Sequence, residues 1–382
     1  MRENGGGQVS RRNLANTTRS RPIAYRAGVK TLSRRALNRA TLERQHLLAF
    51  SDRSVAEMLE HLVGMQAQNP LDPYYGLWAR LQDFDPAVLA RMTTEREVVR
   101  GQFMRGTIHL FTADGAVAVH PLTKSVLERV FRSTQFSKDI AGVDLELLLS
   151  SGREQIEERP RTRAELAREL TGMFPGVAPG SLAQAVTYLT PVAQVPPRGV
   201  WGSTGPAAWA PIDTFLGRPY GDGISVDDLM IRYLAAFGPA GVKDMRVWSG
   251  LSGLSEIFDR LRPRLRTYRD EDGAELFDLP EIELPDPETP APPRLLPEYD
   301  NVLLGHSDRS RFFEGDAVPP GWVGNVLVDG VYSGSWKRTG RALEASLTDR
   351  GLADEEAVHV EATRLAGMAW PGEVIEIRFE RS

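Results

Sequence analysis

Two glutamines separated by one small residue form the most distinctive polar motif of the chain. The segment 64–70 reads Gly-Met-Gln-Ala-Gln-Asn-Pro and places Gln66 and Gln68 at the C-terminal end of an apolar helical pattern. Side chains at positions i and i+2 do not share a helix face. Both amides can therefore point into one cavity only if the helix unwinds there, which the following Asn-Pro favours. An amide carbonyl can orient a water molecule while the NH₂ group is anchored to a neighbour. The alternative interpretation is a polar helix end without chemistry.

A second polar cluster follows in the segment 103–109. If strand alternation holds, Arg105, Thr107 and His109 lie on one face of a strand. A lone histidine on a strand is more often structural than functional, and both interpretations stay open. The segment 296–311 gathers Glu, Asp and His without the regular spacing of metal ligands. The chain also lacks a phosphate-binding loop, a serine elbow and an HExxH helix. We therefore expect neither a metal nor a cofactor.

The composition excludes several kinds of site. The chain has 382 residues and no cysteine, which rules out disulfides, cysteine-bound zinc, iron–sulfur clusters and cysteine nucleophiles. No apolar run approaches the roughly 20 residues needed to span a bilayer. The N-terminus has no apolar core of the kind found in a signal peptide. These features predict a cytoplasmic protein that does not contact a membrane.

Positive charge is distributed unevenly. The net charge is −5, yet residues 1–45 hold 11 Arg or Lys against 2 Glu, so the remainder is strongly acidic. The protein surface can therefore carry one basic face while its opposite face is acidic. Only five lysines occur, and arginine forks suit phosphate oxygens. A GC-rich genome that favours arginine codons explains the same bias equally well.

The order of apolar patterns divides the chain. Residues 1–28 predict a disordered basic tail, which either scans DNA or is an over-long start. Residues 29–115 predict helices followed by a small hairpin at 98–111, which is a winged-helix pattern. Residues 116–220 repeat it, with a capping box at Thr162, a helix at 182–189 and strands at 192–195 and 200–202. Residues 221–280 give a third copy, with helices at 226–237, 242–250 and 254–261 and a hairpin at 265–279.

The remainder of the chain predicts a different kind of unit. Residues 281–293 are rich in Pro, Asp and Glu and predict an extended acidic linker. Residues 294–382 predict a β-rich unit, with Asp329-Gly330 as a hairpin turn. We expect its strands at 302–304, 322–328, 331–336 and 374–379, and its helices at 342–347 and 355–366. The fold class expected for the whole chain is α+β.

Several longer segments together resemble the AlkZ-type DNA glycosylases. They are LSRRALNRATLERQHLL (32–48), HLVGMQAQNPLDPYYGLWARL (61–81), MRGTIHLFTADG (104–115), LLPEYDNVLLGHSDRSRF (295–312) and VLVDGVYSGSW (326–336). The resemblance implies three tandem winged helices that form a C-shaped concave DNA-binding surface, followed by a C-terminal β-rich element. The family's Gln–aliphatic–Gln catalytic motif matches Gln66-Ala67-Gln68. A sister branch carries Asp at the second position, so Gln68 places the chain in the AlkZ-like branch.

The resemblance implies a monofunctional enzyme that removes N7-alkylated purines, including bulky or crosslinked adducts, from double-stranded DNA. Self-resistance to a DNA-alkylating natural product is the role implied. A base alkylated at N7 leaves as a neutral molecule and needs no general acid. We assign Gln68 to the attacking water and Gln66 to positioning or sugar contact. No lysine lies near Gln66 in sequence to form a Schiff base.

We expect a monomer without an obligate protein partner. The residues expected to bind DNA or line its cleft are Arg105, Thr107, His109, Arg198, Arg246, Tyr268 and Arg269.

Two other functions remain open at this point. A non-catalytic winged-helix regulator would bind DNA through the same elements, but such proteins usually act as dimers on palindromic sites. A drug-sequestering protein would hold a free genotoxin in an apolar pocket lined by residues such as Trp78, Trp201 and Trp248.

Overall fold

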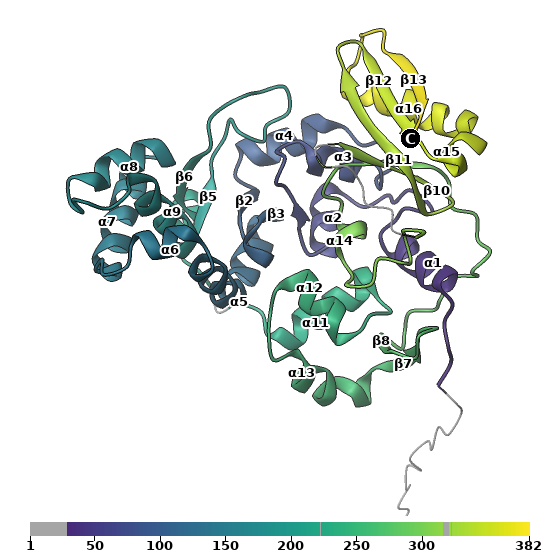
Figure 1. Cartoon of the computed structure of the whole chain (residues 1–382), viewed down its shortest axis with the longest axis horizontal. Coiled ribbons are helices and arrows are strands. Elements are labelled where there is room, and N and C mark those ends of the chain that lie inside the picture. Colours follow the sequence, from purple (N-terminus) through teal and green to yellow (C-terminus); the bar gives the residue numbers. More distant parts are fainter. Residues whose placement is uncertain (1–28, 222, 316–320, 322) are drawn as a thin grey trace, which may run out of the picture.

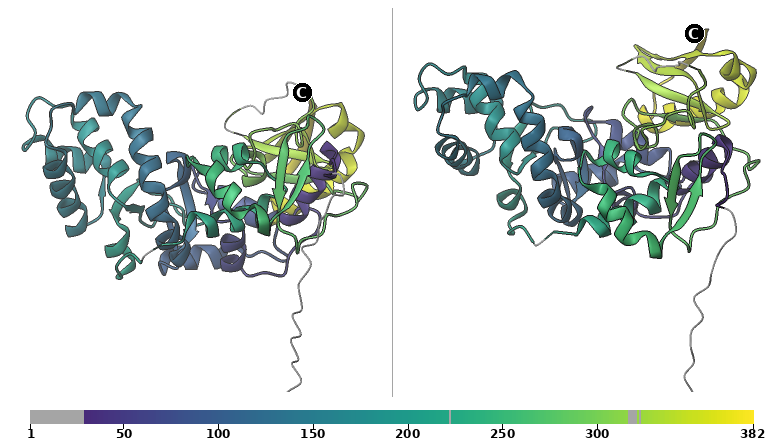
Figure 2. Two further views of the ribbon diagram at one scale, coloured as in Figure 1. Left: turned by 90° about the horizontal axis from the view of Figure 1, so that it is seen from below. Right: turned by 60° about the horizontal axis from the view of Figure 1, so that its bottom comes forward.

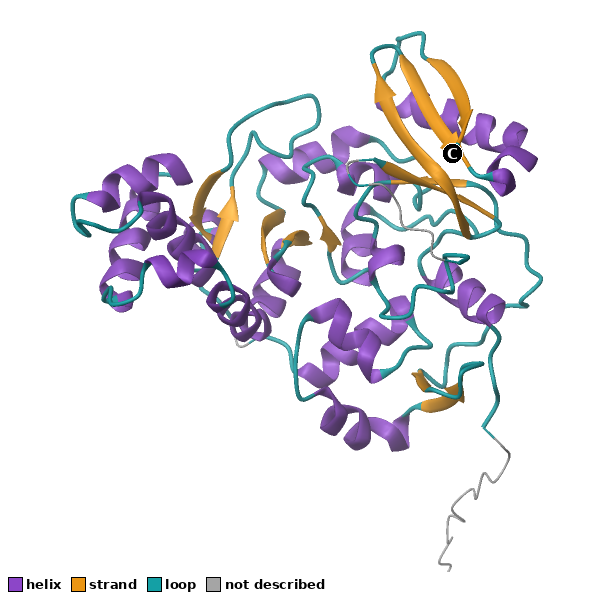
Figure 3. Cartoon of the chain, viewed as in Figure 1, coloured by secondary structure: helices purple, strands orange, loops and turns teal. Residues whose placement is uncertain are grey.

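The computed structural model describes residues 29–221, 223–315, 321 and 323–382 of the chain. The tail predicted for residues 1–28 lies outside the described residues. The fold is mixed α and β, as expected, and its longer strands gather at the C-terminal end of the chain (Figure 3). A helical lobe around α6–α9 and the sheet of β9–β13 lie at opposite ends of the molecule (Figure 1). Both views of Figure 2 keep this arrangement, with the first helices and strands between the two ends.

Two sets of elements with the same order share one six-stranded sheet. The sheet has the order β1-β3-β2-β5-β6-β4, and the antiparallel pair β2–β5 joins its two halves. In each half the first strand pairs with the third. The first set is α2 (Val55–His61), β1 (Met65–Gln66), α3 (Asp72–Trp78), α4 (Pro86–Thr94), β2 (Val98–Gln102) and β3 (Ile108–Thr112). The second set is α7 (Leu145–Glu158), β4 (Arg161–Thr162), α8 (Arg163–Thr171), α9 (Pro179–Leu189), β5 (Val192–Gln194) and β6 (Ala208–Pro211).

A third set follows the same order with a single bridge in place of its first strand. Ala240 forms this antiparallel bridge with Phe277 on the last strand. The helices are amphipathic, and their apolar faces meet in one core with β2 and β3. The set consists of α11 (Val226–Phe237), α12 (Val242–Ser249), α13 (Leu254–Leu261), β7 (Arg266–Arg269) and β8 (Glu275–Asp278).

Helix α5 (Ala113–Arg132) connects the first two sets and was not predicted from the sequence. Thr112 caps it by accepting a hydrogen bond from the Gly115 N–H. It packs against both η1 (Met104–Gly106) and α9. The remaining short helices are α1 (Arg34–Arg44), α6 (Gln135–Asp139), α10 (Ile212–Leu216) and η2 (Arg262–Arg264). No helix among the described residues has the length and apolar character needed to cross a membrane.

The C-terminal part forms a five-stranded sheet of the order β13-β12-β11-β10-β9. Its inner face packs on α16 and on residues of α1 and α3. The Asp329-Gly330 hairpin turn is confirmed, with both residues at positive φ. Its elements are β9 (Arg294–Leu296), α14 (Asn301–Leu304), β10 (Gly324–Val328), β11 (Val331–Thr339), β12 (Ala342–Leu347), α15 (Asp349–Ala353), α16 (Glu355–Ala369) and β13 (Glu376–Arg381).

Three element predictions are wrong. Residues 342–347 form strand β12 rather than a helix, because pairing with β11 and β13 overrides the helix propensity of Ala, Leu and Glu. Residues 302–304 belong to helix α14, which Asp300 caps by accepting from the Val302 N–H. Residues 200–202 form a turn, and the strand expected there is β6, further along the chain.

Candidate active site

Gln66 ends a short strand and Gln68 lies two residues beyond it, so neither glutamine lies at the end of a helix. Helix α2 ends at His61, and Val63 and Gly64 then adopt left-handed backbone with φ of 55° and 76°. A Cβ added to Gly64 would lie 2.6 Å from the Phe111 ring, so both the backbone and the packing require glycine. This turn sends the chain into β1, which pairs antiparallel with β3. The expected unwinding of the helix therefore happens before the motif is reached.

Strand alternation brings the two amides to one side. Ala67 is fully buried between them, whereas Gln66 and Gln68 both line a cavity of about 580 Å³. Gln66 is buried at 6% exposure and Gln68 is exposed. In extended backbone the residues i and i+2 face the same side, so both glutamines reach the cavity without an unwound helix.

Both carbonyl oxygens are held by protein donors. The Gln66 Oε1 accepts a hydrogen bond from Arg105 Nη2 at 2.6 Å, and the Gln68 Oε1 accepts from the Ile108 N–H at 3.3 Å. These partners can only donate, which fixes the orientation of both amides. Each Nε2 forms no hydrogen bond with another described residue. The expectation that the NH₂ groups are anchored is therefore wrong, although each carbonyl keeps a second lone pair for a water molecule.

Asn301 holds the backbone of the motif from the C-terminal unit. Its Oδ1 accepts from the Gln66 N–H at 3.2 Å, and its Nδ2 donates to the Gly64 carbonyl at 2.8 Å. The sequence showed this residue only as part of the polar segment 296–311. No group of three or more His, Asp or Glu side chains among the described residues is arranged to hold a metal ion.

Arg105 supports Gln66 from within the protein. It lies in the 3₁₀ turn η1 with φ of 57°, so it does not share a strand face with Thr107 and His109 as predicted. Its Nη1 donates to the Trp248 carbonyl, and its Nη2 serves Gln66. Burial lowers the pKa of Arg105 to about 10, which leaves the guanidinium charged at neutral pH. Arg105 does not line the cavity and is a positioning residue in this structure.

His109 is a buried neutral side chain next to Arg105. It is 2% exposed, and burial together with the Arg105 charge lowers its pKa to about 3. Its Nδ1 lies 3.0 Å from the Thr107 carbonyl and must donate to it. Its Nε2 is then an acceptor, 3.5 Å from Arg105 Nη2. This geometry supports the structural interpretation of His109, because both ring nitrogens face protein partners and burial favours the neutral ring.

We expect Arg105→Met to lower base release at least about tenfold without preventing folding, because the Gln66 carbonyl loses the donor that orients it. Single-turnover excision, compared with the wild type at saturating protein, measures the effect. Excision at the wild-type rate would show that Gln66 is oriented without Arg105.

Acid is expected to destabilise the protein between pH 6.5 and 4. Burial lowers the pKa of five histidines, to about 4 for His46 and His120, to about 3 for His109 and His306, and also below the usual value for His61. The unfolded chain therefore binds more protons in this window, so their stability contribution is complete above pH 6.5 and is lost as the pH falls. Asp72 acts oppositely, since burial raises its pKa to about 8, and burial also raises the pKa of Glu43 and Asp278, but these are three groups against five. A urea midpoint that stays constant from pH 7 to pH 5 would contradict this.

The other walls of the cavity come from the second set of elements and from residues 299 and 100–108. Thr107 and Arg198, both predicted to bind DNA or line its cleft, line this cavity. Several lining residues were missed because nothing in the sequence alone relates them to the two glutamines. They are Arg100, Gln102, Arg163, Gln184, Tyr188, Gln194, Trp209 and Tyr299.

Three predicted residues lie away from this cavity. Tyr268 is 5% exposed and packs with Leu276 in a small apolar cluster, so its prediction as a cleft residue is wrong. Arg269 is exposed on β7 and donates to the Gly273 carbonyl at 2.6 Å. Arg246 is exposed on α12. The structure therefore brings together Gln66, Gln68, Thr107 and Arg198 but not these three.

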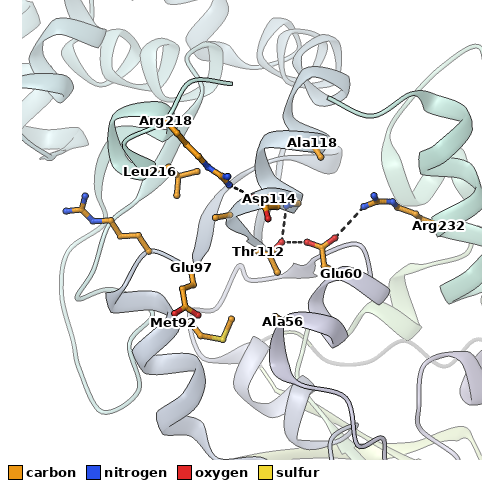
Figure 4. Close-up of a pocket in the computed structure, with 13 residues that line it drawn as sticks. Ala56, Glu60, Met92, Glu97, Thr112, Asp114, Ala118, Leu216, Arg218 and Arg232 are labelled. Atoms are coloured by element: carbon orange, nitrogen blue, oxygen red, sulfur yellow. Dashed lines mark hydrogen bonds and ion pairs between the residues drawn. The ribbon is translucent and has the colours of Figure 1, made fainter. Parts of the chain in front are cut away.

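A larger cavity of about 680 Å³ lies near the other end of β3 (Figure 4). Its lining holds three arginines and three carboxylates, of which Arg232 pairs with Glu60 at 3.4 Å and Arg218 with Asp114 at 2.5 Å. The Thr112 hydroxyl also donates to Glu60. Because these groups already have partners, we place the candidate site at the glutamines.

Comparisons with protein-family models and with solved structures both give matches. The family model described as DNA glycosylase AlkZ-like matches residues 59–368. Among solved structures, the Streptomyces sahachiroi DNA glycosylase AlkZ is similar, with a TM-score of 0.68 and 20% sequence identity. The match covers 92% of this chain and 100% of that protein. A search of curated protein sequences gives no match.

Proposed function

The chain belongs to the AlkZ-like DNA glycosylase family, and we propose that it hydrolyses the N-glycosidic bond of N7-alkylated purines in double-stranded DNA, with Gln66 and Gln68 at its centre. The observation that carries this proposal is the chemistry of the cavity. Gln66 and Gln68 face it together with three further glutamines, and neither a carboxylate nor a lysine is found among the described residues that line it. Such a site has no strong acid, so it suits a leaving group that needs none.

An N7-alkylated purine provides that leaving group. Its base already carries a positive charge, and when the C1′–N9 bond breaks the electron pair neutralises it. The sugar is left with oxocarbenium character and is captured by water, whose second proton is released to solvent. Fixed dipoles and correct placement of the water are then the main contributions of the protein.

The two glutamines divide this work in our proposal. The free lone pair of the Gln68 carbonyl accepts a hydrogen bond from the attacking water, because Gln68 is the more exposed of the two. The buried Gln66, oriented by Arg105, donates from Nε2 to a sugar or phosphate oxygen of the lesion nucleotide. Full activity in Gln68→Ala beside an inactive Gln66→Ala would overturn this division.

We infer that the three sets of helices and strands are winged helices, because their order and pairing are those of that motif. Residues 29–115, 116–220 and 221–280 would be the three units, joined by the linker 281–293 to the β-rich part 294–382. They would form the concave DNA-binding surface, with Arg246 and Arg269 contacting the backbone. We propose that one chain acts as a monomer on bulky or crosslinked adducts, and that its role is self-resistance to a DNA-alkylating natural product.

The proposal is tested on duplex DNA with one N7-methylguanine and on duplexes with bulkier N7 adducts. We expect free purine by mass spectrometry and an abasic site that breaks only after alkali treatment. A borohydride-trapped covalent complex would refute the monofunctional mechanism. DNA binding without release from any of these substrates would instead favour a non-catalytic regulator.

A further inference from the structure

The cavity beside the two glutamines carries positive charge that no lining carboxylate balances. Three arginines line it: Arg100 on β2, Arg163 at the start of α8, and Arg198 on the segment between β5 and β6. Asp and Glu are absent from the described residues that form its walls. The hydrogen bonds of the three guanidinium groups go to uncharged groups. Arg100 also interacts with Asp72, which does not line the cavity and whose pKa burial raises to about 8.

Arg163 is fixed in place with most of its donors free. Its Nε donates to the Thr187 hydroxyl at 2.9 Å, and its guanidinium carbon lies 4.9 Å from the centre of the Trp209 ring. The two Nη groups form no hydrogen bond with another described residue. The guanidinium group is thus held in place by its Nε hydrogen bond and by the Trp209 ring, and its two free Nη groups can donate to an anionic oxygen.

The other two arginines add unused donors to the same cavity. Arg198 Nη1 donates to the Gly205 carbonyl at 3.2 Å, while its Nε is buried without a partner among the described residues. Arg100 Nη2 donates to the Ala67 carbonyl at 2.6 Å, and its Nε and Nη1 are likewise buried and unpaired. Burial, and then the charge of Arg198, lowers the pKa of Arg100 to about 9. Like charges and unpaired buried donors are costly unless an anion joins them.

We propose that this cavity binds a phosphodiester group of the lesion strand, with Arg163 and Arg198 as its direct ligands and Arg100 behind them. The inference rests on the proposed function and extends it. The sugar develops positive charge while the two amides remain neutral, so the bound phosphate supplies negative charge that the lining residues lack. The negative charge near the sugar then comes from the substrate, and the arginines of the protein hold it in place.

The first test compares Arg163→Gln with Arg168→Gln. Arg168 is an exposed residue of the same helix, so the two variants change the net charge equally. Affinity for duplex DNA is measured by fluorescence anisotropy at several salt concentrations. We expect Arg163→Gln to weaken binding about tenfold and to reduce the slope of log K against log salt by about 0.9, while Arg168→Gln changes neither by a comparable amount.

The second test locates the phosphate. The duplex carries an N7-methylguanine made stable by a 2′-fluorine, with a neutral methylphosphonate linkage on one or the other side of it. We expect one of the two linkages to weaken wild-type binding about as much as Arg163→Gln does, and the variant to show no further loss on that duplex. Arg198→Gln should behave in the same way.

Three results would overturn the proposal. The first is an equal loss of DNA affinity in Arg163→Gln and Arg168→Gln. The second is a full additional loss of affinity in Arg163→Gln on the duplexes with either neutral linkage. The third is a loss of affinity confined to DNA whose adduct itself carries an anionic group. The last result would make the adduct the ligand. Because only binding is measured, a failed phosphate site can be told from a failed glycosylase reaction.

Discussion

Replacing Gln66 and Gln68 together by alanine is expected to reduce base release at least about hundredfold, because removal of a single preorganised polar group at a developing charge already costs about that much. The variant loses the amide that holds the sugar and the amide that orients the water. DNA affinity should change little, since neither glutamine carries charge. Single-turnover excision and anisotropy on the same duplex measure the two effects separately.

Gln184→Ala provides the matched control. Gln184 lies on α9, lines the same cavity and offers the same amide, but it belongs to the second set of elements and not to the Gln66-Ala67-Gln68 motif. We expect this variant to excise within a fewfold of the wild type. If it loses as much activity as the double variant, amides anywhere in the cavity would matter equally and the centre would be misassigned.

Asp300→Ala is expected to lower the free energy of unfolding by about 3–5 kcal/mol, the usual cost of removing one partner from a buried ion pair. Asp300 and Arg80 are both fully buried and form two hydrogen bonds, at 2.6 and 2.8 Å. Without Asp300 the Arg80 charge stays inside the protein uncompensated. The loss would be read from urea unfolding at pH 7.

The same substitution should also affect the site, because Asn301 follows Asp300 and holds the Gln66 backbone. The double variant Arg80→Met/Asp300→Leu removes both charges and keeps apolar volume. It should recover most of the stability lost in Asp300→Ala. Equal stability of Asp300→Ala and the wild type would mean that the pair contributes nothing to the join between the N-terminal and C-terminal parts.

Local patterns predicted many of the helices and hairpins well. The helices at 226–237 and 254–261 agree with α11 and α13 because their apolar spacing is regular and their ends carry turn residues. The helix predicted at 342–347 was wrong because Ala, Leu and Glu favour a helix in isolation, whereas pairing with two neighbouring strands decides the conformation of this segment.

The site was only partly predictable for a related reason. Gln66 and Gln68 stand out as a motif, yet their shared face depends on pairing with β3, which is more than 40 residues away. Arg163 and Trp209 give no local signal, because tertiary contacts such as the β2–β5 pair bring their half of the sheet to the glutamines. The prediction of Tyr268 as a cleft residue was wrong because an aromatic residue on a hairpin fits a packed apolar cluster as well as a binding surface.

The central claim, that this chain releases alkylated purines through Gln66 and Gln68, is tested most directly by one time course. Free N7-methylguanine is measured from the same alkylated duplex with the wild type and with Gln66→Ala/Gln68→Ala, at matched DNA occupancy. We predict release by the wild type and only the uncatalysed rate with the variant. Equal release by the two proteins would place the chemistry elsewhere in the molecule and contradict the account.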